Sequence, residues 1–228
     1  MKKKHLVLTL ILLITTALLI GGCGTNKAAT EKPANDQASN NQTEQTTPAA
    51  DQTKQWDNPP AMEIDTNKSY SAELTTTKGT FTIELFAKEA PKTVNNFVFL
   101  SRQGYYDNVI FHRIIESFMI QTGDPTGTGM GNPGYKFEDE KTNYTYEPGI
   151  VAMANAGPDT NGSQFFICTG EDSVGLNSQP NYTIFGKVTD GMDVVKQIAA
   201  TPVDVGPGGE TSSPTETIQI KEIKIVEK

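Results

Sequence analysis

Cysteine and histidine, the residues that most often hold metals or act as nucleophiles, are scarce in this chain of 228 residues. It has two of each, and His5 and Cys23 lie within the first 23 residues. The other two are His112 and Cys168, and neither an HExxH nor a CxxC motif occurs. The sequence therefore predicts no metal site, no cofactor and no intramolecular disulfide. Cys168 stands in the apolar run FFIC, where we expect a small buried core residue.

Basic residues are also few. Lys and Arg number 19 against 27 Asp and Glu, which gives a net charge of -8. Removal of residues 1–22, which hold three lysines and no acid, would leave 16 basic and 27 acidic residues and a net charge of -11. Because phosphate backbones are bound through basic residues that displace counterions, this charge excludes nucleic acid as a partner.

A hydrophobic run long enough to cross a membrane is missing too. The N-terminal run follows MKKKH and covers 15 residues, 6–20, whereas a spanning helix needs about 20. A basic patch before a short apolar run is typical of a secretory signal peptide. The following IGGC, which ends at Cys23, resembles a bacterial lipobox and implies a signal peptide over 1–22 and a lipid-modified Cys23. The alternatives are an ordinary signal peptide with an incidental cysteine, or an uncleaved anchor.

Residues 23–60 contain little that could be buried. Asn, Gln, Thr, Ala and acidic residues dominate this segment, and Trp56 is its only aromatic residue. Such a composition cannot offset the chain entropy lost on folding, so we expect a disordered polar tether. Residues 61–228 have the length of one compact domain with a core of its own.

Short apolar segments alternate with turns through most of this domain. The alternating segments 70–76 and 80–86 flank a turn at 77–79 and predict a β-hairpin. Helical spacing begins at Pro91 and stops before Gly104, and a second short helix is predicted over 192–199. Further strands are predicted at 109–114, 119–122, 150–153, 165–169, 183–188 and 217–226. Many short strands with two helices favour a mainly β fold, a closed antiparallel barrel.

The polar residues exclude several kinds of catalysis. A Ser-His-Asp hydrolase would have to use Ser163, His112 and Asp124, but Ser163 lies in NGSQF without the GxSxG turn. The glycine-rich loop after Asp124 lacks the GK[ST] ending of a phosphate-binding loop. What remains is Arg113, in the segment FHRIIESFMIQTGD (111–124). On its own, Arg113 is interpreted as a surface residue with a buried stem or as half of a structural ion pair.

That segment and MANAGPDTNGSQFFICTG (153–170) closely resemble the two core motifs of the cyclophilins, which are peptidyl-prolyl cis-trans isomerases. The resemblance spans 62–228 and implies an eight-stranded barrel capped by two helices. It also implies that Arg113 hydrogen-bonds the substrate around the prolyl amide and that Gln121 supports the arginine. Resonance opposes rotation of this amide with a barrier of about 18–20 kcal/mol. A fixed donor can stabilise the twisted state without acid, base or nucleophile.

The resemblance assigns substrate-binding residues as well. It implies an apolar pocket for the proline ring, formed by Phe118, Met119, Phe166 and Leu176. Ala154 and Ala156 would line an adjoining groove. Asn155 and Gln164 would be the polar groups that position the substrate. Tyr182 would close one wall of the pocket. Ordinary core packing is the alternative for a lone Phe or Met, and we expect it for Phe165, Ile167 and Ile120. His112 is predicted to be a structural strand residue.

Two departures from the cyclophilin pattern lie in the segment 170–182. Gly175 stands where many cyclophilins have a tryptophan before the leucine, and Tyr182 stands where they have a histidine. The loop 170–181 is also longer than the simplest alignment of Leu176 and Tyr182 with the family requires. Because the family's indole contacts the drug, the missing tryptophan puts cyclosporin affinity in doubt more than catalysis.

The sequence as a whole predicts a lipid-anchored isomerase that accelerates X-Pro isomerisation in secreted or cell-envelope proteins, outside the membrane. Its expected partners are proline-containing polypeptides and, through acylated Cys23, the bilayer. Nothing in the sequence indicates more than a monomer. The main alternative is a cyclophilin-like module or chaperone that binds proline segments with negligible turnover. A hydrolase using Ser163 ranks last.

Overall fold

The computed structural model describes residues 54–228, so the predicted signal peptide, Cys23 and most of the predicted tether lie outside the described residues. Within 54–228, no helix is both long and apolar enough to cross a membrane. The elements, in chain order, are β1 (Tyr70–Thr76), β2 (Gly79–Leu85), α1 (Pro91–Arg102), β3 (Arg113–Ile115), β4 (Met119–Thr122), β5 (Ile150–Met153), β6 (Phe165–Cys168), a 3-10 helix (Glu171–Ser178), β7 (Ile184–Asp190), α2 (Met192–Ala199), β8 (Val203–Val205), β9 (Thr211–Pro214) and β10 (Ile220–Glu227).

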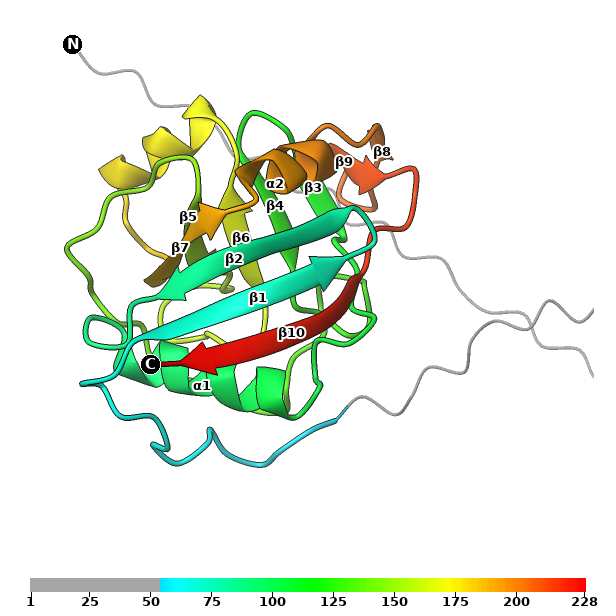
Figure 1. Cartoon of the computed structure of the whole chain (residues 1–228). Coiled ribbons are helices and arrows are strands. Elements are labelled where there is room, and N and C mark those ends of the chain that lie inside the picture. The colour runs from blue at the N-terminus through cyan, green and yellow to red at the C-terminus, as the bar shows by residue number, and fades with distance from the viewer. Residues whose placement is uncertain (1–53) are drawn as a thin grey trace, which may run out of the picture. The chain divides into compact units, whose positions relative to one another are not determined.

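Eight of the strands form one curled antiparallel sheet in the order β10-β1-β2-β7-β5-β6-β4-β3 (Figure 1). The predicted mainly β class and the hairpin β1–β2 are confirmed. The prediction of a closed barrel is wrong, because the two edge strands β3 and β10 form no ladder with each other. Only an isolated bridge between Ile110 and Gln219 and a few neighbouring backbone hydrogen bonds join the two edges. The sheet is a half-barrel.

The gap at these edges has a physical cause. β3 begins at Arg113 and is only three residues long, whereas the sequence predicted a strand over 109–114. The ribbon β8–β9, which the sequence did not predict, is inserted between α2 and β10, and β9 packs beside β3. The edge strand β3 is therefore flanked by β9 and not by β10.

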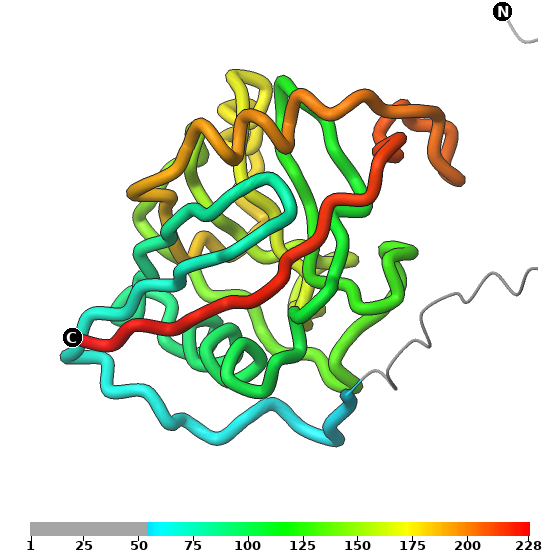
Figure 2. The backbone as a smooth tube through the Cα atoms, turned by 45° about the vertical axis from the view of Figure 1, so that its right-hand side comes forward, coloured from blue at the N-terminus to red at the C-terminus, as the bar shows by residue number. Residues whose placement is uncertain are grey.

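Two helices cover the sheet, and both were predicted. α1 has Pro91 at its first turn and buries Val94, Phe97 and Leu100. α2 follows Gly191, whose positive φ of 74° suits glycine, and it packs against β2. The two helices lie at opposite ends of the curled sheet (Figures 1 and 2).

Side chains of the sheet alternate between two hydrophobic clusters. In β6, Phe165 and Ile167 belong to the main core, whereas Phe166 and Cys168 belong to a smaller cluster on the other face. In β4, Ile120 lies in the main core and Met119 in the smaller cluster. Core packing is thus confirmed for Phe165, Ile167 and Ile120, and Cys168 is a buried free cysteine as expected.

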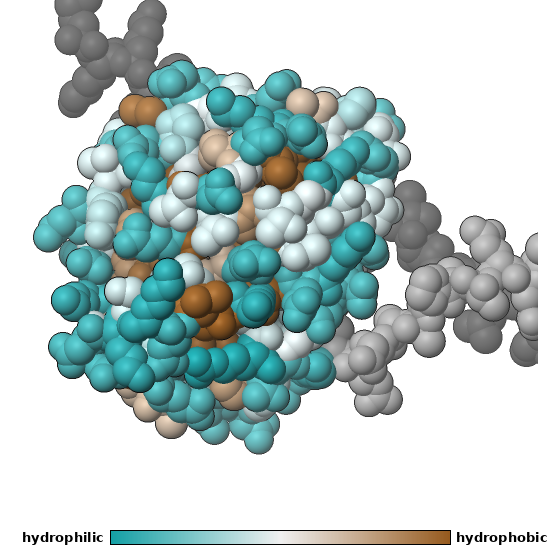
Figure 3. Space-filling model, in the orientation of Figure 1, coloured by the Kyte–Doolittle hydropathy of each residue, from teal (hydrophilic) through white to brown (hydrophobic). Residues whose placement is uncertain are grey.

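Part of the predicted tether lies on the domain. Trp56 packs edge-on against Phe99 of α1, with ring centroids 5.2 Å apart, and tilts against Tyr105 at 5.8 Å. Its backbone N–H donates to the carbonyl of Pro133 at 2.9 Å. Residues 54–60 therefore belong with the folded part of the chain. The face in view in Figure 3 is mostly hydrophilic, with apolar residues in small separate patches.

Candidate active site

Strand register brings the predicted catalytic residues into one row across three strands. Arg113 on β3 lies opposite Gln121 on β4, and Gln121 lies opposite Phe166 on β6. Ala152 on β5 continues the row beyond Phe166. Because alternate residues of a strand share a face, this row lies on the face that carries the smaller cluster.

The polar groups of the row are joined by hydrogen bonds. Nη1 of Arg113 donates to Oε1 of Gln121 at 3.4 Å, and Nε2 of Gln121 donates to Oε1 of Gln164 at 3.0 Å. Gln164 in turn donates to the carbonyls of Gly129 and Gly131. The structure therefore assembles Arg113, Gln121 and Gln164 as one network anchored on the glycine-rich loop.

A buried carboxylate shapes that loop. Asp124 accepts backbone N–H bonds from Thr126, Thr128 and Gly131 at 2.7–3.1 Å. Burial alone would raise the pKa of Asp124, but hydrogen bonds from Gly131 and Thr126 outweigh it, so the pKa is lowered. The ionised carboxylate thus collects the N–H groups of the loop, whose carbonyls hold Gln164.

The apolar residues predicted to hold the proline ring gather beside this network. Met119 and Phe166 are buried, while the more exposed Phe118, Leu176 and Ala154 pack against the same cluster. Tyr182 packs edge-to-face on Phe166, with ring centroids 5.5 Å apart. Tyr182 is fixed by Tyr146, whose hydroxyl accepts the Tyr182 N–H and donates to the Tyr182 carbonyl.

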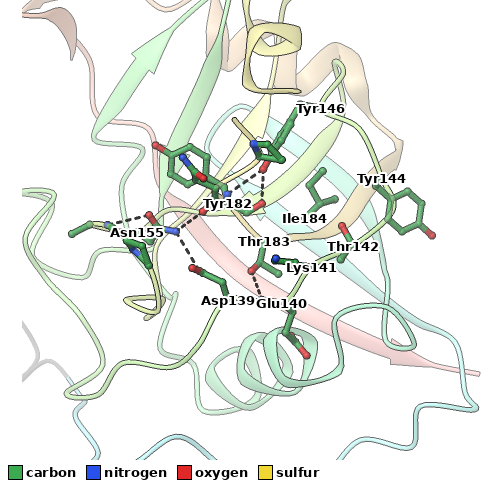
Figure 4. Close-up of a pocket in the computed structure, with 15 residues that line it drawn as sticks. Asp139, Glu140, Lys141, Thr142, Tyr144, Tyr146, Asn155, Tyr182, Thr183 and Ile184 are labelled. Atoms are coloured by element: carbon green, nitrogen blue, oxygen red, sulfur yellow. Dashed lines mark hydrogen bonds between the residues drawn. The ribbon is translucent and has the colours of Figure 1, made fainter. Parts of the chain in front are cut away.

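Asn155 and Ala156 line an adjoining cavity of about 620 Å³ that Tyr182 also borders (Figure 4). The Asn155 amide donates to the carbonyl of Asn181 at 2.9 Å and, more weakly, to Asp139. It therefore ties the segment before Tyr182 to the segment 154–157. Tyr144, Tyr146 and Ile184 supply the apolar part of the cavity wall.

The hydroxyl and the imidazole of the hydrolase alternative form no hydrogen bond with each other. Ser163 is buried, and its hydroxyl donates to the Gly123 carbonyl at 2.7 Å. Neither ring nitrogen of His112 has a hydrogen-bond partner among residues 54–228. Burial lowers the pKa of His112, so its imidazole is neutral at neutral pH. No nucleophile and base are therefore paired here.

Other reactive chemistry finds no support in the described part of the chain. Residues 54–228 contain no group of three or more His, Cys, Asp or Glu placed to hold a metal ion. Burial raises the pKa of the Cys168 thiol to about 11, so the thiolate is scarce at neutral pH.

The sequence missed two residues that shape the site. Glu210 forms a two-point ion pair with Arg113, through Nε at 2.7 Å and Nη2 at 2.9 Å. Tyr146 positions Tyr182 as described. Nothing in the sequence near Glu210 signals this contact, since 97 residues separate it from Arg113 and GPGGETSSP is typical of an exposed turn.

Comparison with known proteins points to one class. Residues 71–225 match the family model described as "Cyclophilin type peptidyl-prolyl cis-trans isomerase/CLD". The chain is 45% identical over 163 residues to peptidyl-prolyl cis-trans isomerase CYP18-2 of Arabidopsis thaliana, covering 68% of this chain and 92% of that protein. It is 44% identical over 160 residues to human peptidyl-prolyl cis-trans isomerase-like 3, covering 68% and 95%.

Solved structures agree with the sequence relatives. A cyclophilin-type isomerase of Cryptosporidium parvum superposes with a TM-score of 0.62 at 39% identity, over 69% of this chain and 98% of that one. A crystal structure of the same protein in the presence of the dipeptide Ala-Pro gives a TM-score of 0.61 at 40% identity, over 68% and 98%. The chain therefore belongs to the cyclophilin-type peptidyl-prolyl cis-trans isomerases.

Proposed function

We propose that this isomerase acts at the outer side of a bacterial cell membrane, lipid-anchored through Cys23, and accelerates X-Pro isomerisation in secreted or cell-envelope proteins. The observation that carries the catalytic part is the Arg113–Gln121–Gln164 network beside the pocket of Met119 and Phe166. The proposed location rests on the N-terminal sequence, because the relatives above align with about two thirds of the chain.

The geometry supports catalysis by differential binding. The proline ring would sit against Phe118, Met119, Phe166 and Leu176, with Tyr182 as a wall. Arg113 would donate to the substrate beside the prolyl amide, and Gln121 would hold the guanidinium toward the groove. These donors stabilise the twisted amide more than either planar form, so the barrier falls while no covalent bond breaks.

The peptide on either side of the proline would lie along the polar part of the groove. Ala154 and Ala156 would leave room for its backbone, and Asn155 and Gln164 would supply hydrogen bonds. Uncatalysed X-Pro isomerisation takes tens to hundreds of seconds, which is slow enough to limit the folding of exported chains. An isomerase held where such chains emerge would remove that delay.

The catalytic proposal is tested by cis-trans exchange spectroscopy of a proline peptide with the full chain and two variants. The chain has two arginines, each in an exposed ion pair, Arg113 with Glu210 and Arg102 with Glu227. Arg113→Ala should lower kcat/KM by about 100-fold, whereas Arg102→Ala should stay near wild type. Equal activity of Arg113→Ala and wild type would contradict the proposed role.

The proposed location has its own measurement. Mass spectrometry of the N-terminus of the protein recovered from membranes should show a chain that begins at Cys23 and carries acyl groups. Cys23→Ala should release the protein from the membrane fraction, because the 15-residue run is short for a span. An unmodified chain that begins at another residue would overturn the anchor and leave the isomerase assignment intact.

A binding module with negligible turnover is the second candidate, and one observation favours it. Arg113 already donates two hydrogen bonds to Glu210, so part of its donor capacity is in use before a substrate arrives. The same exchange experiment separates the two candidates. Peptide binding that shifts resonances without faster cis-trans exchange would identify a binding module.

A further inference from the structure

We propose that Glu210 is a positioning residue for Arg113, one that clamps one edge of the guanidinium so that the opposite donors face the proline pocket. The inference rests on the proposed catalytic role of Arg113. It adds to the site a residue from the β8–β9 ribbon, outside the two sequence motifs.

This inference rests on how the N–H donors of Arg113 are shared between Glu210 and the side of the pocket. A guanidinium has five N–H bonds, and Glu210 accepts one from Nε and one from Nη2. Nη1 points to the other side, with Oε1 of Gln121 at 3.4 Å and Sδ of Met119 at 3.6 Å. The Nη1–Nη2 edge therefore keeps donors for a substrate carbonyl, and the carboxylate fixes the plane in which they lie.

Glu210 is itself held in place. Its backbone carbonyl accepts the N–H of Gly206 at 2.8 Å, which closes the turn between β8 and β9. The hydrogen bond from Arg113, opposed by burial and assisted by Ser212, lowers the pKa of Glu210, so the carboxylate is charged at neutral pH. Ser212 is buried on β9, the strand that packs beside β3. The ribbon thus presents an ionised carboxylate from a fixed position.

A different role for Glu210 predicts the opposite change in activity when Glu210 is replaced. If Glu210 were an internal competitor that the substrate must displace, its removal would free the arginine and raise activity. If Glu210 positions Arg113, its removal lets the guanidinium rotate away from Gln121 and lowers activity. The sign of the change therefore decides between the two roles.

The test compares Glu210→Gln with Asp204→Asn in the full chain. Asp204 is exposed on β8 of the same ribbon, so its variant removes the same charge, and its carboxylate has no hydrogen bond or ion pair within residues 54–228. By exchange spectroscopy on a proline peptide, Glu210→Gln should lower kcat/KM by about five-fold, the upper range for an exposed ion pair, and Asp204→Asn should stay near wild type. An unchanged or raised kcat/KM in Glu210→Gln, or an equal fall in both variants, would overturn the proposal.

A second readout does not depend on turnover. In full chain labelled with 15N-arginine, the Nε–Hε resonance of Arg113, assigned by its loss in Arg113→Lys, should exchange slowly with water in wild type and in Asp204→Asn. It should exchange rapidly in Glu210→Gln. If the resonance exchanged just as slowly in Glu210→Gln, the clamp would be refuted, whether or not the wild type is active. An inactive wild type would by itself refute only the proposed function.

Discussion

Phe165 and Phe166 are neighbours in β6 with side chains on opposite faces, and their replacement by leucine should separate stability from catalysis. Phe165 packs edge-to-face against Phe97, Tyr106 and Phe185, at centroid distances of 5.4, 5.7 and 6.3 Å. Phe166 makes one such contact, with Tyr182 at 5.5 Å. Each aromatic pair contributes about 0.5–1.5 kcal/mol beyond the area it buries. The two substitutions therefore remove unequal amounts of packing.

From these contacts, Phe165→Leu should lower the free energy of unfolding by about 2–4 kcal/mol, and Phe166→Leu by about 1 kcal/mol. Activity should change in the opposite order. Phe166→Leu alters the floor of the proposed proline pocket and should lower kcat/KM by about ten-fold, the scale of a modest change in an apolar pocket. Phe165→Leu should leave kcat/KM near wild type while the protein is folded.

Urea unfolding of the full chain gives the stabilities, and cis-trans exchange of a proline peptide at a temperature where both variants are folded gives the activities. Leucine is chosen because Phe→Ala in a core costs about 3–5 kcal/mol, a large part of a typical total of 5–15. If Phe165→Leu lost as much activity as Phe166→Leu, the separation of core and site by the two faces of β6 would be refuted.

Three further predictions concern single residues. Gly175→Trp should raise cyclosporin affinity with little loss of stability, because a Cβ atom at Gly175 would meet no atom within 4 Å. Isothermal titration with unchanged affinity would contradict this. Asp124 has a lowered pKa, so its stabilisation is present above its unfolded pKa and is lost as the pH falls through the folded value. Asp124→Asn should therefore lower stability at pH 7 and flatten its decline below about pH 4 in acid titrations followed by circular dichroism. In the variant Cys23→Ala, iodoacetamide at pH 8 should label Cys168 only after unfolding, because burial raises the thiol pKa to about 11. Mass spectrometry measures the labelling. Rapid labelling of the folded chain would refute the assignment of Cys168 to the interior.

The proximity of Arg113, Gln121, Gln164 and Phe166 was predictable from the sequence, because these residues lie in two short segments whose strands pair directly. Once β4 pairs with β3 and β6, the two-residue period of a strand places Arg113, Gln121 and Phe166 in one row. The same period sends Phe165 and Ile167 into the core. Local pattern and family resemblance therefore sufficed for this part of the molecule.

The features that the sequence did not reveal depend on contacts between distant segments. Barrel closure would require the edge strands β3 and β10 to pair with each other. The unpredicted ribbon β8–β9 precedes β10 in the chain, and its strand β9 packs beside β3. The 3-10 helix over Glu171–Ser178 has no apolar periodicity from which it could have been predicted. Trp56 was assigned to a polar tether because the aromatic surface it covers, Phe99 and Tyr105, belongs to a different part of the sequence.

The loop fixed by Asp124 has a consequence for the entropy of binding. Its N–H groups are directed at one carboxylate and its carbonyls at Gln164, so the loop and the glutamine are immobilised when the chain folds. Ordering a rotamer-rich side chain on association costs about 0.5–1.5 kcal/mol. That cost is met during folding and does not recur with each substrate. A peptide that enters the proposed groove would therefore meet polar groups that are already in place.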